Sequence, residues 1–199
     1  IDYIEKVPAK ERTRSNIVEA IQLGKDLSLV FPKQEGRALL TRLRELGVDV
    51  FMIRPIPHKM LFDRTNLFVE AGKPFEIIFE NIDIMPHNLV VTTPGAREEV
   101  GILAEKMGSS PDAFAKEFIP ETDKILPATG MLQPGQQQRL QLTAPKLLGD
   151  YPFVCTFPGH WAVMNGVMHV VDEVDANRTV TRREADPEST PTREFVRDW

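Results

Sequence analysis

The pattern of apolar and polar residues changes twice along the chain. Up to about residue 47, apolar residues recur three and four positions apart, which is typical of amphipathic helices. These positions are Ile17, Ile21, Leu39, Leu43 and Leu46. Pro32 interrupts the pattern, and Gly47 is a suitable helix stop. We therefore predict two helices, either packed on the main domain or forming the last unit of an upstream helical repeat, which is the preferred interpretation.

From residue 48 the residue pattern is typical of short β-strands. The stretches "VDVFMIRPI", "NLFVEAGKPFEIIFENID" and "HNLVVTT" are rich in β-branched and aromatic residues and are broken by Gly, Pro and Asn-Asp, which predicts an antiparallel sheet. Alternation resumes later in "GMLQPGQQQRLQLTAP", "YPFVC" and "NGVMHVVDEV". Some seven or eight short strands of this kind predict a mainly β fold, a sandwich with Greek-key connections.

A helical excursion interrupts the strands in "REEVGILAEKMGSSPDAFAKEFIP". Within it, Ser110, Pro111 and Asp112 combine a cap, a proline for the first helical position and an acid for the first turn, so we expect a helix to begin there. Beyond Asp172 the chain is charged and poor in apolar residues, which is typical of a linker or a disordered tail. The predicted division is a helical segment at 1–47, a β domain at 48–172 and a tail at 173–199.

Composition excludes some classes of protein. The net charge of −5 and the pI near 5.5 argue against sequence-independent binding of nucleic acid, which needs a basic surface. No apolar run approaches the roughly 18 residues that a membrane-spanning helix needs. The single cysteine cannot form an internal disulfide.

That cysteine lies in "CTFPGHWAVM", beside one of the four histidines and one of the seven methionines of the chain. Cys155 ends a predicted strand, and Pro158 and Gly159 favour a turn that can return His160 to the thiol. Met164 follows where the next strand begins, close enough to approach the same point. The loop can therefore supply three donors to one site.

A further donor must come from elsewhere, and His87 in "MPHNLVV" begins a strand that can neighbour this loop. One thiolate, two imidazoles and a thioether suit a metal that cycles between cuprous and cupric states. Zinc would accept cysteine and histidine, but it gains little from a thioether, and structural zinc sites usually use several cysteines. Taken singly, each residue is explained by core packing or an ordinary hydrogen bond, but their coincidence favours a copper site.

These motifs resemble the cupredoxins, especially the azurin and plastocyanin group, in which the copper ligands read His, then Cys-x4-His-x3-Met. The resemblance covers about residues 49–171, and the matching residues here are His87, Cys155, His160 and Met164. It implies an eight-stranded cupredoxin sandwich with one type 1 copper per chain, serving one-electron transfer. The same resemblance implies a periplasmic or otherwise extracytoplasmic location.

The resemblance also assigns neighbouring residues. Asn88 matches an asparagine that ties the two ligand loops together by a hydrogen bond. Pro86 stands where azurins have glycine, as in plastocyanins, which makes a fifth ligand doubtful. We expect Met168 to be a core residue of the exit strand, His169 to face the other side, and His58 to be a turn or surface residue. The extra helices suggest a domain within a larger redox protein.

For function, we expect an electron-transfer protein or domain rather than an enzyme, with His160 as the exit port. An uncharged docking face is expected from Met85, Pro86, Phe157, Pro158 and Trp161. Its partner would be a redox protein such as a c-type cytochrome, or a fused or associated dehydrogenase.

Other interpretations stay open. The same ligands could serve a non-redox copper-binding or sensory domain. A multicopper oxidase would need more than four histidines for its trinuclear cluster, and a dinuclear site of the cytochrome oxidase type would need two cysteines. An enzyme with Cys155 as nucleophile is the other class, and it predicts a thiol that alkylates readily even when copper is present.

Overall fold

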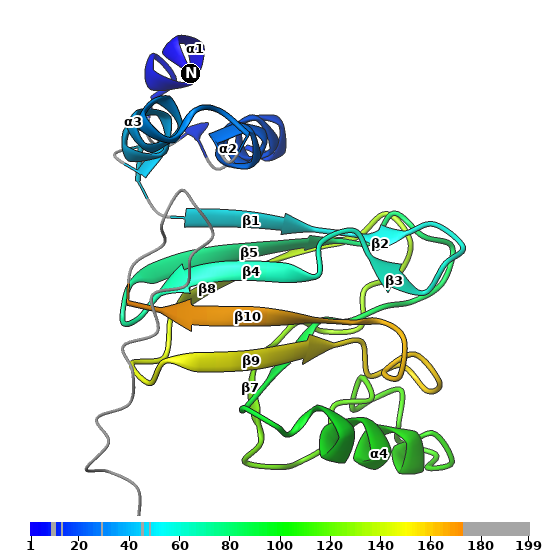
Figure 1. The fold of residues 1–199 in the computed structure, drawn as a ribbon. Helices are drawn as coiled ribbons and strands as arrows, with labels where there is room; N and C mark the ends of the chain where they lie inside the picture. Colours follow the sequence, from blue (N-terminus) through cyan, green and yellow to red (C-terminus); the bar gives the residue numbers. More distant parts are fainter. Residues whose placement is uncertain (9–10, 13, 29, 45, 48, 173–199) are drawn as a thin grey trace, which may run out of the picture.

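The computed structural model describes residues 1–172 except 9–10, 13, 29, 45 and 48, so the prediction for the tail at 173–199 lies outside the described residues. Strands form two packed sheets, one with the order β1-β5-β8 and one with the order β4-β10-β9-β6-β7, beside a small β2-β3 hairpin (Figure 1). The strands are β1 Asp49–Ile53, β2 Pro55–Ile56, β3 Leu61–Phe62, β4 Asn66–Glu70, β5 Pro74–Glu80, β6 Val90–Thr92, β7 Ile125–Ala128, β8 Gln137–Thr143, β9 Gly149–Val154 and β10 Asn165–Val171. The predicted β-sandwich is confirmed.

Apolar side chains from both sheets fill the space between them. The rings of Phe62, Phe79 and Phe153 meet at its centre, with centroid separations of 5.9 Å for the first two and 5.5 Å between Phe62 and Phe153. Cys155 and Met164 belong to the same buried cluster. The site described below is therefore an edge of the core rather than a surface loop, and the close packing of the core fixes its position.

The prediction of an antiparallel sheet holds for most strand pairs but not for all. The pairs β1–β5 and β4–β10 are parallel, while β5–β8, β9–β10, β6–β9 and β6–β7 are antiparallel. The strands β4 and β5 follow each other in sequence, but they belong to different sheets. The turn between them crosses from one sheet to the other, with Gly72 at φ 69° and the amide of Ala71 donating to Val171. The alternation of apolar and polar residues is the same on either side of such a crossing as in a hairpin, so the sequence pattern does not distinguish the two.

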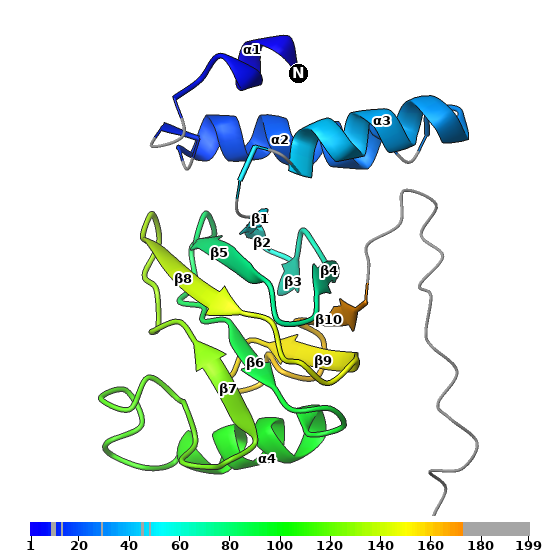
Figure 2. The same ribbon diagram turned by 90° about the vertical axis from the view of Figure 1, so that its left-hand side faces the viewer.

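Three helices form a separate layer over β1, namely α1 Asp2–Glu5, α2 Ser15–Ser28 and α3 Lys33–Arg44 (Figures 1 and 2). Val18 of α2 is fully buried in a small cluster with Val50, Met52 and Ile78 of the underlying sheet. Lys25 of α2 forms an ion pair with Asp49 at the start of β1. The helical segment thus packs on the sandwich, whereas its place at the end of an upstream repeat stays a prediction.

The excursion contains one helix, but it lies earlier than predicted. Helix α4 spans Arg97–Met107, and residues 111–118 form consecutive turns. Ser110 bonds to the side chain of Asp112, but Glu117 and Phe118 have φ values of 54° and 55°, which an α-helix does not allow. The start signal therefore caps a turn and not a helix. Strand β7, which follows, and the short β3 were not predicted.

The two helical additions lie at opposite sides of the sandwich, with α1–α3 beyond β1 and α4 beyond β9 and β7 (Figures 1 and 2). Within the described part of the chain, no helix is long and apolar enough to cross a membrane. Helix α4 lies beside the loop that follows β9, and this loop carries three of the four predicted ligands.

Candidate metal centre

Three of the predicted ligands converge at one buried point. The Sγ atom of Cys155 lies 3.7 Å from Nδ1 of His87 and 3.5 Å from Nδ1 of His160, and the three ligand atoms all lie within 4.8 Å of one another. All three residues are buried. Nitrogen and sulfur atoms at these separations surround a volume that suits one metal ion.

The loop after β9 brings Cys155, His160 and Met164 together by its own hydrogen bonds. The amide of Cys155 donates to the carbonyl of Met164 at 3.0 Å, and the amide of Met164 donates to the carbonyl of His160 at 2.8 Å. Gly159, at φ 82°, makes the turn between them. The side chain of Met164 is completely buried. These bonds close the loop on itself and fix the positions of its three donor residues.

His87 comes from a different loop, which hydrogen bonds to two other segments hold in place. Its backbone exchanges hydrogen bonds with Leu132, at 3.1 and 2.8 Å. The side chain of Asn88 accepts from the amide of Thr156 at 2.8 Å and donates to the hydroxyl of Thr156 at 2.7 Å. Asn88 and Thr156 are both fully buried, so neither has water as an alternative partner. The predicted asparagine tie joins the two ligand loops.

One buried acid beside the ligands was not predicted from the sequence. The Oδ2 atom of Asp83 lies 3.0 Å from Nε2 of His87, and the two side chains are 1% and 0% exposed. Burial acts to raise the pKa of Asp83, but hydrogen bonds from His87 and from the amides of His58 and Ile84 outweigh it, so the net shift of this pKa is downward. The only sequence signal is an acid four positions before the histidine, which is also common in turns.

Burial sets the protonation of the other two ligands in the metal-free chain. It raises the pKa of the Cys155 thiol to about 11, although backbone hydrogen bonds from Asn88 and Phe157 act in the opposite direction. It lowers the pKa of His160 to about 4, and the neighbouring His87 adds to this effect. At neutral pH the imidazole of His160 is therefore an unprotonated donor and the thiol keeps its proton. A metal that binds here must displace that proton.

Helix α4 and the turns that follow it cover part of the predicted docking face. The indole of Trp161 lies directly on Gly101, where an added Cβ would fall 2.2 Å from Cδ2 of the ring. The carboxylate of Glu105 accepts the amide of Gly159 at 3.0 Å. Phe157 is half-buried between the rings of Phe118, at 5.3 Å, and His160, at 4.8 Å. The aromatic residues of the ligand loop are thus half-buried by the excursion.

The remaining candidates lie where the sequence placed them. Met168 is a core residue at 2% exposure. His169 faces the outer side of the sheet, where it stacks on Phe68 and bonds to Asp150 and Asn66. His58 is exposed in a turn at φ 63°. Neither His58 nor His169 belongs to the cluster of ligand atoms.

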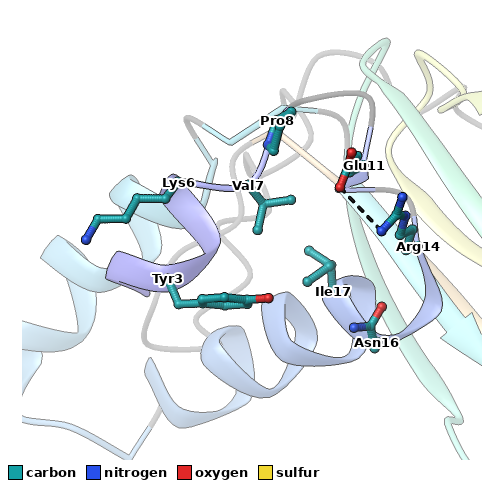
Figure 3. Close-up of a pocket in the computed structure, with 8 residues that line it drawn as sticks. All are labelled: Tyr3, Lys6, Val7, Pro8, Glu11, Arg14, Asn16 and Ile17. Atoms are coloured by element: carbon teal, nitrogen blue, oxygen red, sulfur yellow. Dashed lines mark ion pairs between the residues drawn. The ribbon is translucent and has the colours of Figure 1, made fainter.

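A hollow of about 280 Å³ lies in the helical layer, between α1 and the start of α2 (Figure 3). Its lining residues are Tyr3, Lys6, Val7, Pro8, Glu11, Arg14, Asn16 and Ile17. It is open and mixed in polarity, with an ion pair of 3.3 Å between Glu11 and Arg14 at its rim. No predicted ligand lines this hollow, so it is separate from the metal centre.

The comparisons with known proteins agree with this geometry. Residues 54–171 match the model of the copper-binding proteins of the plastocyanin/azurin family. The chain belongs to this family, and the resemblance drawn from the ligand motifs is confirmed. The cofactor of the family is copper. The donor set fits it, because a buried thiol, two imidazoles and a thioether are the soft and borderline donors that a copper couple prefers.

Similar proteins come from several bacteria. Outer membrane protein H.8 of Neisseria gonorrhoeae is 33% identical over 120 residues, which are 57% of this chain and 63% of that protein. Auracyanin-A of Chloroflexus aurantiacus is 30% identical over 114 residues, or 56% of this chain and 68% of that protein. The crystal structure of dithionite-reduced auracyanin from Roseiflexus castenholzii superimposes with a TM-score of 0.55 at 29% identity, covering 63% of this chain and 99% of that one. The cupredoxin fold is thereby confirmed.

Proposed function

We propose that the chain transfers single electrons through one type 1 copper ion, as a carrier or as the relay domain of a larger redox protein. His87, Cys155 and His160 would be the strong ligands, and Met164 would be the weak axial one. The observation that carries the proposal is the placement of Sγ within 3.7 Å of both Nδ1 atoms in a buried cradle. Copper would supply the one-electron couple.

The residues around the site serve this role by resisting rearrangement. Fast electron transfer requires that both oxidation states accept nearly the same ligand positions. The Asn88–Thr156 pair and the backbone bonds within residues 155–164 hold the donors from two sides. The buried Met164 and the ring of Phe157 keep water from the donors. These features favour an electron carrier over a site that must admit a substrate.

The enzyme alternative, with Cys155 as nucleophile, finds less support. A catalytic cysteine needs a lowered pKa and access to its substrate. Here the thiol is completely buried and its pKa is raised to about 11. The neighbouring His160 has a lowered pKa, which weakens it as a general base near pH 7. A protected metal ligand agrees with all three properties.

We place the protein outside the cytoplasm, and its partner would be a redox protein such as a c-type cytochrome or an associated dehydrogenase. The Neisseria relative is an outer membrane protein, which supports the location. The matched residues span 63% of the length of that relative. The role of the whole protein is therefore proposed here and is not taken over from the relative.

The first test is the colour of the cupric protein. A thiolate bond to cupric copper should give an intense visible charge-transfer band that ascorbate bleaches reversibly, at one copper per chain. Cys155→Ser should abolish the band, whereas His169→Ala should keep it, because His169 faces away from the ligand cluster. Absorption during copper titration measures this. A colourless cupric complex of the parent would refute the type 1 assignment.

The second test distinguishes two buried methionines. Met164→Leu should leave the protein blue and raise its reduction potential by ~60 mV or more, about one tenfold step for a one-electron couple, because an axial thioether favours the cupric state. Met168→Leu makes the same chemical change, loss of a thioether, at a core position and should leave the reduction potential nearly unchanged. Voltammetry of both variants decides the assignment. A larger shift for Met168→Leu would transfer the axial role to that residue.

The third test concerns the docking face. Electrons should pass at the His160 end, where Val163 of the ligand loop remains 50% exposed beside the partly covered Trp161. Val163→Lys should slow reduction by a soluble c-type cytochrome by about tenfold and leave the visible spectrum intact. Leu147→Lys is the matched control, since this residue is 73% exposed at the other end of β9, about 20 Å away along the strand.

An apolar contact should also respond weakly to salt, whereas charge steering would make the rate fall steeply. Stopped-flow kinetics at low and high ionic strength provide this measurement. If Leu147→Lys slows transfer as much as Val163→Lys, or if the parent rate collapses with salt, the partner docks elsewhere.

A further inference from the structure

The metal centre includes a buried acid beyond its ligands. Asp83 lies in the loop between β5 and His87, and its side chain is 1% exposed. Its Oδ1 atom accepts the amides of His58, at 3.1 Å, and of Ile84, at 2.7 Å. Its Oδ2 atom lies 3.0 Å from Nε2 of His87. An ionised carboxylate is the form that accepts all three of these bonds without donating any.

The loop that carries Asp83 is itself fixed. Asn81 accepts the amide of Asp83 at 3.0 Å and donates to the carbonyls of Met85 and Leu132, both at 2.8 Å. Leu132 is also the residue that exchanges backbone bonds with His87. The carboxylate and the imidazole are therefore held at both ends of one short loop, and their contact is a fixed part of the site.

This contact determines which nitrogen of His87 is free. A neutral imidazole carries one N–H, and the acceptor-only carboxylate places that N–H on Nε2. The Nδ1 atom lies 3.7 Å from Sγ of Cys155 and then directs its lone pair toward the space between the ligand atoms. The negative charge is buried, where it also favours the more positive oxidation state of a bound metal.

We propose that Asp83 is a positioning residue of the copper centre, which fixes His87 in the tautomer that binds metal through Nδ1 and biases the site toward the cupric state. The proposal rests on the proposed copper function. The sharpest variant is Asp83→Asn. Because two amides point at the Oδ1 position, the amide oxygen of asparagine belongs there, and its NH₂ group then faces Nε2 of His87. That NH₂ group favours the opposite tautomer, with the proton on Nδ1.

The first measurement uses the metal-free protein with ¹⁵N-labelled histidine. Imidazole ¹⁵N shifts of the parent should show the Nε2–H form of His87, and Asp83→Asn should shift the population toward the Nδ1–H form. The signals of His169, which Asp150 and Asn66 hold on the outer face, should not change and so report that the fold is intact. An Nδ1–H form in the parent would overturn the proposal, even if the variant does not fold.

The second measurement uses the copper-loaded protein. Asp83→Asn should lower cupric affinity by about 10- to 100-fold and shift the electron equilibrium toward cuprous copper by about tenfold, or ~59 mV. Asp123→Asn removes the same charge from an exposed position, where the side chain is 88% exposed, and should change neither value. A blue parent whose affinity and potential survive Asp83→Asn would overturn this proposal alone, whereas a colourless parent would overturn the copper function itself.

Discussion

The buried pair of Asn88 and Thr156 is the interaction on which the centre depends. Asn88 follows the first histidine ligand, Thr156 follows the cysteine, and their two mutual hydrogen bonds join loops that are 68 positions apart in sequence. Because both residues are completely buried, breaking the pair would leave polar groups without partners. The pair therefore holds His87 next to Cys155, and the sandwich beneath supports both loops. The remaining donors, His160 and Met164, are set by bonds local to their own loop.

Local signals made the ligand loop predictable from sequence. All of these signals lie within a few residues of one another. They are the turn at Gly159, the spacing from Cys155 to Met164 and the strand-like residue pattern on each side. Met168 and His169 could be assigned to opposite faces because a strand alternates strictly. The sequence could offer His87 only as a candidate donor, because nothing local to it shows which strand it will meet, and the resemblance then assigned it as a ligand. The structure supplies that partner in Thr156.

What the sequence missed depends on contacts between distant segments. The strands of the parallel pairs β1–β5 and β4–β10 have the same alternation of apolar and polar residues as antiparallel strands. The sequence therefore does not show that the chain passes from one sheet to the other at the turn of Gly72. The capping residue predicted at Ser110 does bond to Asp112, but the positive φ values at Glu117 and Phe118 prevent the following residues from forming an α-helix. Asp83 resembled an ordinary turn residue. Its role becomes visible only when Nε2 of His87 is placed against it.

The excursion changes how the centre meets its surroundings. Helix α4 lies on the ligand loop through Gly101 and Trp161, and Glu105 accepts the amide of Gly159. This cover leaves Val163 as an exposed apolar residue of the ligand loop, while the ring of Phe157 packs against Phe118 and the main core. The helices α1–α3 lie on the far side of the sandwich (Figure 1), so they leave this end free for a partner.

We expect the hydrogen bonds within and between the two ligand loops to hold the donors in nearly the same positions with and without the metal. High-resolution crystal structures of the metal-free, cuprous and cupric protein test it directly. We predict that the distances from Sγ of Cys155 to Nδ1 of His87 and of His160, 3.7 and 3.5 Å, change by no more than about 0.5 Å among the three structures, with the Asn88–Thr156 pair intact. A histidine that swings away in any of these states would contradict it.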